Sequence, residues 1–76
     1  MKALLETLAR ELVDDPLSVS VAEFDEGDGL FLELSVAPED RGFVIGKRGR
    51  TADALRIVLD AVARSRGTNC DMEIVD

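Results

Sequence analysis

The sequence contains no histidine, and this absence removes the side chain that most often acts as a general base or binds a metal. It also has no tyrosine or tryptophan and only three phenylalanines, so aromatic platforms for stacking bases are scarce. The single cysteine, Cys70, has no partner for an internal disulfide. Because no adjacent nucleophile and base is available either, we expect neither an enzyme nor a metal or cofactor site.

Long apolar runs are also missing: none approaches the roughly 20 residues of a membrane-spanning helix. The opening Met1-Lys2 leads directly into an amphipathic pattern that contains acids, which is not typical of a signal peptide. With 46% hydrophobic and 33% charged residues, the composition indicates one soluble globular domain over residues 1–76. We therefore expect a cytoplasmic protein without membrane contact, small enough to benefit from dimerisation.

The net charge of −7 argues against a nucleic-acid binder until the charge is divided along the chain. Residues 1–40 hold two cations and eleven acids, whereas residues 41–66 hold seven cations and two acids. Local potential, not the global sum, steers a polyanion to a site. The basic segment can therefore bind nucleic acid, while the acidic remainder should weaken non-specific binding and make affinity sensitive to salt.

The cations gather at a short motif in which Gly46 and Gly49 flank Lys47 and Arg48, and Arg50 follows directly. Glycine reaches backbone conformations closed to other residues and lets an anionic backbone approach closely. A helix that begins after the motif would add unpaired N–H groups and the positive end of its dipole. We interpret the motif as a clamp for a sugar-phosphate backbone; a simple turn between two helices, with solvated cations, is the alternative.

Hydrophobic periodicity predicts three helices and three strands in the order α-β-β-α-α-β. The expected helices cover residues 2–13, 38–44 and 51–66, and the expected strands cover residues 17–26, 30–36 and 70–75. The turn signal at residues 27–29 joins the first two strands as an antiparallel hairpin. The crossover through two helices makes the second and third strands parallel neighbours. The predicted fold class is α+β, with a three-stranded mixed sheet and all helices on one face.

Three local features of this fold are interpreted from parity and spacing. Leu17, Val19 and Val21 share the inward face of the first strand, whereas Phe24 has the opposite parity. Either a bulge near residues 22–23 returns Phe24 to the core, or it covers the exposed side. Cys70 alternates inward and is expected to be buried and inert.

Charged pairs elsewhere have ordinary explanations. Adjacent acids at residues 14–15 and 39–40 lie at helix boundaries, where capping and solvation account for them. Arg50 could pair with Asp53 across the first helical turn instead of binding a ligand. The arginines outside the motif are expected to be ordinary helix surface.

The run Val44-Ile45-Gly46-Lys47-Arg48-Gly49-Arg50-Thr51, set between helices in this topology, resembles the loop of the type II KH domain. The wider run from Ala37 to Ala52 is similar to the small, single-KH bacterial RNA-binding proteins of the KhpA family, and the resemblance spans essentially the whole chain. It implies a groove between the loop, its flanking helices and the adjoining sheet edge, and this groove holds about four nucleotides of single-stranded RNA or DNA.

Carried onto this chain, the resemblance implies that Gly46, Lys47, Arg48 and Gly49 contact the backbone of the nucleic acid. It implies an apolar floor under the bases formed by Val44, Ile45 and Leu55, although their apolar stripes make all three core residues first.

The family is associated with dimerisation, with a larger KH- and Jag-containing partner called KhpB, with RNA chaperone-like activity and with cell-shape control. Two functions are therefore weighed. One is a sequence-tolerant, single-stranded RNA-binding module that acts in post-transcriptional regulation. The other is a protein-interaction or dimerisation module whose RNA contact is weak or belongs to the partner.

Overall fold

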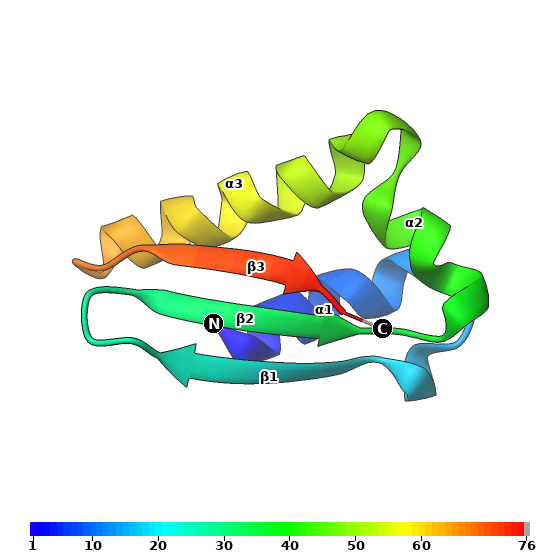
Figure 1. Cartoon of the computed structure of the whole chain (residues 1–76), viewed down its shortest axis with the longest axis horizontal. Helices are drawn as coiled ribbons and strands as arrows, with labels where there is room; N and C mark the ends of the chain where they lie inside the picture. Colours follow the sequence, from blue (N-terminus) through cyan, green and yellow to red (C-terminus); the bar gives the residue numbers. More distant parts are fainter. Residues whose placement is uncertain (76) are drawn as a thin grey trace.

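The computed structural model describes residues 1–75 and has the predicted order of elements (Figure 1). The elements are α1 (Lys2–Leu12), β1 (Ser20–Asp25), β2 (Leu30–Ser35), α2 (Arg41–Ile45), α3 (Arg50–Ser65) and β3 (Cys70–Ile74). Single turns of 3-10 helix occupy Pro16–Ser18, Pro38–Asp40 and Lys47–Gly49. No helix in this described part of the chain has both the length and the apolar character needed to cross a membrane.

The sheet has the order β1-β2-β3, with β2 in the centre. β1 pairs antiparallel with β2, and β3 pairs parallel with β2 on the other side. In this register Val21 lies beside Leu34, and Leu34 lies beside Ile74, so the inward-facing residues of all three strands form rows. The predicted mixed sheet and its central second strand are confirmed.

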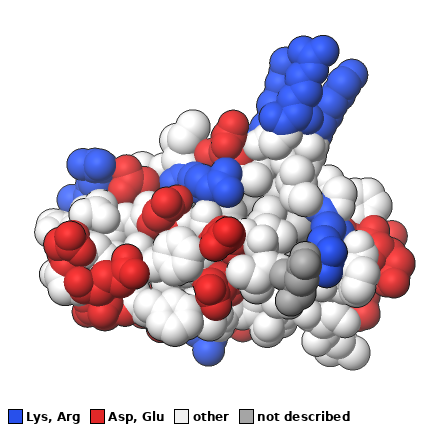
Figure 2. Space-filling model, viewed as in Figure 1, with Lys and Arg blue, Asp and Glu red and all other residues white. Residues whose placement is uncertain are grey.

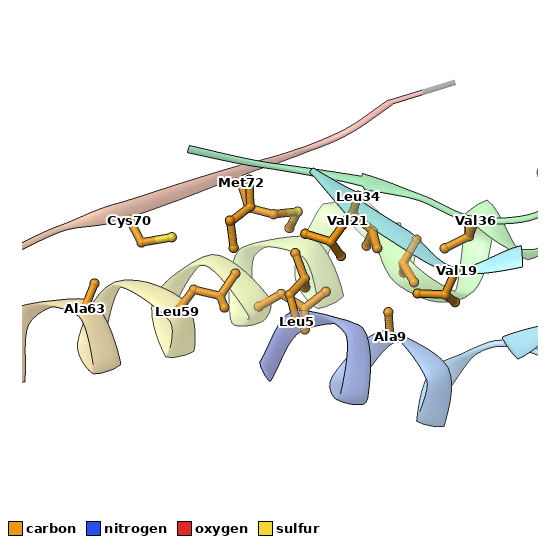
Figure 3. Packing of buried hydrophobic residues seen from close by; sticks show 13 residues of the cluster. Leu5, Ala9, Val19, Val21, Leu34, Val36, Leu59, Ala63, Cys70 and Met72 are labelled. Atoms are coloured by element: carbon orange, nitrogen blue, oxygen red, sulfur yellow. The ribbon is translucent and has the colours of Figure 1, made fainter. Parts of the chain in front are cut away.

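All three helices lie on one side of the sheet, as predicted, and the core fills the space between the two layers (Figures 1 and 3). α1 contributes Leu5 and Ala9, and α3 contributes Leu59 and Ala63, all fully buried. Each strand of the sheet contributes inward-facing side chains to the same core, which include Val21, Leu32, Leu34, Cys70 and Met72. This packing holds α3 against the sheet, and the loop before it is thereby fixed at one end of the molecule.

The prediction for the start of β1 was wrong. Leu17 is 96% exposed, because residues 16–18 form a 3-10 turn and the strand begins only at Ser20. Pro16 favours such a turn because its ring fixes φ. Asp15 closes the turn, since its carbonyl accepts the N–H of Ser18 and its carboxylate accepts the Ser18 hydroxyl at 2.6 Å.

Phe24 lies on the open face of the sheet, so the second of the two alternatives for this residue is correct. The register of β1 on β2 is unbroken from Ser20 to Asp25, and Phe24 stands directly beside Phe31. Phe24 is 47% exposed. The absence of a bulge between these strands leaves an aromatic pair on the side away from the helices.

The acid at the boundary of α2 is not a solvated residue, and this corrects the interpretation of residues 39–40. Asp40 is only 3% exposed, and its carboxylate accepts the backbone N–H of Asp15 at 2.9 Å. Glu39 remains exposed. Asp40 therefore ties the segment after α1 to the turn that precedes α2.

Candidate nucleic-acid interface

The loop between α2 and α3 is a compact turn with its own hydrogen bonds. α2 ends at Ile45, and the N–H of Gly46 closes its last turn on the carbonyl of Gly42 at 2.9 Å. The N–H of Gly49 then donates to the carbonyl of Gly46 at 3.1 Å, and the N–H of Arg50 donates to the carbonyl of Lys47. These bonds fix the path of the backbone around the two cations at the tip.

The two glycines of the loop have different roles. Gly46 has φ of 76°, and a Cβ placed there would lie 2.8 Å from the backbone nitrogen of Thr51. Gly49 has φ of 74°, but a Cβ placed there would meet no atom within 4 Å. Gly46 therefore lets the loop close onto the first turn of α3, whereas Gly49 supplies a left-handed turn that faces open space.

Arg48 has a left-handed backbone with φ of 58° and ψ of 25°, and within residues 1–75 it is the one non-glycine residue with positive φ. This conformation costs an ordinary residue about 1–2 kcal/mol. Strained residues of this kind cluster at ligand-binding sites. Together with Gly49, Arg48 turns the backbone sharply, and its exposed side chain lies at the tip of the loop.

Within residues 1–75, the cations Lys47, Arg48 and Arg50 differ from three other arginines in having no acidic partner. Arg10, Arg56 and Arg64 each pair with a carboxylate, at 3.1, 3.1 and 2.7 Å respectively. Over the described residues, by contrast, no ion pair or side-chain hydrogen bond involves the exposed side chains of Lys47, Arg48 or Arg50.

The expected alternative pair between Arg50 and Asp53 is not formed, because Asp53 accepts Arg56 instead. Figure 2 shows cationic side chains standing clear of the body where Figure 1 places the loop.

The start of α3 adds a further source of positive potential. Gly49 is the N-cap residue, and no side chain caps the first N–H groups of this 16-residue helix. Such N–H groups, with the helix dipole behind them, favour an anion at the helix start. The cations and the helix N-terminus therefore favour negative charge at the same end of the molecule.

The three residues expected to form an apolar floor are not brought to one surface. Val44 is fully buried in the core, so it can support the loop only from beneath. Leu55 is 6% exposed and lines a groove of about 290 Å³ between α1 and α3, with Leu8, Leu12, Ala54 and Val58. Ile45 is 40% exposed at the end of α2.

A second groove, of about 330 Å³, runs between α3 and β3, which is an edge strand of the sheet. Its lining is mostly polar and includes Arg56, Ile57, Asp60, Asn69 and Asp71. Ile57 is 70% exposed, although it is apolar. The resemblance implied a groove at the sheet edge, but Ile57 was not among the residues expected to line it; the only signal was that Ile57 falls outside the buried stripe of its helix.

Side chains cover the outer edge of β3 in this groove. Asp60 accepts the N–H of Cys70 at 3.1 Å, and Asp71 accepts the N–H of Met72 at 2.8 Å. Arg56 donates from Nε to the carbonyl of Met72 at 2.9 Å. An edge strand normally presents unpaired backbone groups to any passing chain. Here three of those groups are already bonded to the protein's own side chains.

Two ionisable groups beside this edge have shifted pKa values. The hydrogen bond from Arg64, with a second from the N–H of Cys70, lowers the pKa of Asp60 below its usual value. Burial raises the pKa of the Cys70 thiol, and the carboxylates of Asp60 and Asp71 raise it further. A buried thiol that stays protonated is unreactive, and Cys70 is a free, buried cysteine as expected.

An α-β-β-α-α-β chain with a three-stranded mixed sheet, and a G-x-x-G loop between its second and third helices, has the type II topology of the KH domain. The chain is therefore a KH-domain protein by its fold. A family model described as "KhpA/KhpB, KH domain" matches residues 2–74. The chain belongs to this family.

Curated relatives match over essentially their full length. The chain is 50% identical to the RNA-binding protein KhpA of Halalkalibacterium halodurans, with all of both chains covered. It is 49% identical to that of Clostridium acetobutylicum, over 99% of this chain and 100% of the relative. It is 43% identical to that of Streptomyces coelicolor, over 100% of this chain and 95% of the relative. No solved structure matches the chain.

Proposed function

We propose that this protein binds single-stranded RNA, with the loop of residues 46–50 holding the sugar-phosphate backbone. The observation that carries the proposal is the group of exposed loop cations without acidic partners in the described chain. Membership of the KhpA/KhpB family supports it, since the curated relatives are named RNA-binding proteins. Single-stranded DNA, which has the same backbone charge, is expected to compete.

The bases would lie along the groove between α3 and β3, whose lining starts at Arg56, about 9 Å along α3 from Arg50 at the loop. Ile57 offers an apolar contact there, and Arg56 and Asp60 line the sides. Because side chains already occupy backbone groups at the edge of β3, few are left to read base edges. Binding would then depend mainly on the sugar-phosphate backbone, and sequence preference would be weak, as suits an RNA chaperone or a general post-transcriptional regulator.

The loop is tested by replacing Lys47 and Arg48 with aspartate. We expect the double variant to lose the gel shift of a labelled single-stranded RNA and to keep the circular-dichroism spectrum of the wild type. Lys2→Asp with Arg10→Asp on α1 is a control of the same charge change, and it should bind RNA nearly as well. If a folded loop variant bound RNA as well as the wild type, the loop would not be the RNA-binding site.

A second function, as a dimerisation or protein-interaction module, is favoured by the apolar groove between α1 and α3. Leu12 is 39% exposed and Val58 is 44% exposed on its walls, and Leu8 and Leu55 line it. A second copy of this chain, or a KhpB-type KH and Jag protein, would cover it. The complex would act on RNA in the cytoplasm and, through the partner, in cell-shape control.

Sedimentation of the purified chain, with and without RNA, separates the two functions. A tight dimer that gives no RNA shift would favour the interaction module, and a monomer that binds RNA well would count against it. Val58→Glu, which places a charge in the groove, should dissociate a dimer built on this surface. The matched control Ile57→Glu, on the neighbouring face of α3, should leave such a dimer intact.

A further inference from the structure

The outer face of the sheet is open, and it bears an aromatic pair. No element within residues 1–75 covers this face, since all the helices lie on the other side (Figures 1 and 3). Phe24 and Phe31 are direct neighbours across β1 and β2, and Phe24 is 47% exposed. A cross-strand aromatic pair can be present only to stabilise a hairpin. The charged residues around the pair are therefore needed to indicate whether it binds a ligand and of which kind.

The charged side chains that the strands themselves place on this face are all negative. Glu33 lies two residues beyond Phe31 on the same face of β2. In the register of the two strands, Glu33 of β2 lies directly beside Glu73 of β3. Like charges placed side by side on neighbouring strands repel each other. Within residues 1–75, no ion pair involves either glutamate. A cation brought by a partner would relieve this repulsion.

Asp71 also lies on this face, beside Phe31 in the register of β2 and β3, but it already pairs with Arg56 of α3 at 3.8 Å and lines the groove between α3 and β3. The three strands contain no lysine and no arginine. Figure 2 shows acidic and uncharged atoms over the area where Figure 1 draws β1 and β2. A polyanion is repelled from such a surface, so RNA at the loop would leave it free.

We propose that this sheet patch, made of Phe24, Phe31, Glu33 and Glu73, binds an arginine-rich segment of a partner protein. A guanidinium group is attracted to the face of an aromatic ring and pairs with carboxylates in a bidentate geometry. Both kinds of group lie together here. The protein would then carry two separate surfaces, a loop for a polyanion and a sheet patch for a polycation.

The spacing of the patch favours an extended segment with arginine at every second position. Phe31 and Glu33 are two residues apart on one strand, which places them about 6.6 Å apart along it. An extended peptide repeats on the same scale, so one arginine can lie over the phenylalanines while the next reaches Glu33 and Glu73. This register fits an alternating arginine sequence better than a helical one.

The test is the binding of a fluorescently labelled peptide of six Arg-Ser repeats to the full chain at low salt, measured by anisotropy. We expect the wild type to bind it and to ignore a matched peptide of Glu-Ser repeats. Phe24→Leu with Phe31→Leu removes the rings, and Glu33→Gln with Glu73→Gln removes the charges. Each double variant should weaken binding about threefold or more.

Two controls locate the site. Asp25→Asn with Asp28→Asn removes the same charge from the neighbouring hairpin, and Lys47→Gln with Arg48→Gln removes the loop cations; neither should weaken peptide binding. The proposal would be overturned if the wild type did not bind the Arg-Ser peptide, or if both sheet-patch variants bound it as tightly as the wild type. If the leucine variant loses its fold, the glutamine variant alone decides.

A second copy of the chain could supply cations through its own loop. Self-association that is lost in both the sheet-patch variant and the loop variant would identify that loop as the occupant. This result would also overturn the proposal. RNA binding by the sheet-patch variants is measured in parallel and should be unchanged.

Discussion

Gly46 and Thr51 meet across the loop so closely that no side chain fits between them. A Cβ at Gly46 would stand 2.8 Å from the backbone nitrogen of Thr51. Gly49 has nearly the same φ, yet its Cβ would face open space. The first glycine of the motif is therefore required by packing and conformation together, and the second by conformation alone.

This difference predicts unequal costs for alanine at the two positions. Gly49→Ala should lower the free energy of unfolding by about 1 kcal/mol, the cost of left-handed backbone for a residue with a Cβ. Gly46→Ala should lower it by about 2 kcal/mol or more, because a clash with backbone cannot be relieved by a rotamer change. Urea denaturation followed by circular dichroism measures both, and equal losses would contradict the packing role of Gly46.

Asp40 predicts a second stability effect away from the loop. Its buried carboxylate accepts the N–H of Asp15, so Asp40→Ala leaves that donor without its partner. The expected loss is about 1–3 kcal/mol in the free energy of unfolding. Glu39→Ala, the adjacent exposed acid, should change it by less than about 0.5 kcal/mol. Similar values for the two variants would show that the Asp40 bond does not stabilise the fold.

The fold followed from local patterns wherever each residue agreed with its neighbours. In residues 30–36 a leucine or valine occupies every second position, and the hairpin turn and the two-helix crossover then determined the strand order. Leu17 was misplaced because the alternation from Leu17 to Val21 continues through Pro16–Ser18, where a proline turn takes precedence over parity. Parity alone could not decide the side taken by Phe24 without the register on β2.

The site could be predicted less completely. The glycines and cations of the loop are contiguous, so their positions at the tip followed from the motif. The covered edge of β3 could not be predicted, because Asp60 and Cys70 are ten residues apart and meet only through the packing of α3 on the sheet. The same packing buries Val44 fully and leaves Leu55 only 6% exposed, on the wall of the groove between α1 and α3, so two residues that the resemblance placed under the bases lie mainly in the core.

Asp60 predicts a dependence of stability on pH. Its pKa is lowered in the folded state, so its contribution is fully present above the ordinary carboxyl pKa and is lost as pH falls through the folded value. Asp60→Asn should therefore destabilise the protein more at pH 7 than at pH 3, as measured by urea denaturation at each pH.

Arg64→Gln removes the first cause of that shift and serves as the matched variant. It should show the same trend, and the double variant should lose less than the two single losses together. A loss for Asp60→Asn that is equal at both pH values would contradict the role of these hydrogen bonds.

The left-handed backbone of Arg48 allows charge and conformation to be separated at the loop. Arg48→Gly removes one cation but accepts φ of 58° without strain, so the fold should be no less stable than the wild type. If the three loop cations contact phosphates, log K against log salt for single-stranded RNA should have a slope near −2, from about −0.7 per contact. Arg48→Gly should reduce its magnitude by about 0.7.

Lys47→Gly is the matched variant, since it removes the same charge from a position without positive φ. It should reduce the slope equally but lower the free energy of unfolding by up to about 1 kcal/mol, the usual cost of added backbone freedom. Arg10→Gln on α1, where the arginine is already paired with Glu6, should leave the slope unchanged. A slope that Arg48→Gly does not alter would mean that this arginine, despite its strained backbone, makes no contact with phosphate.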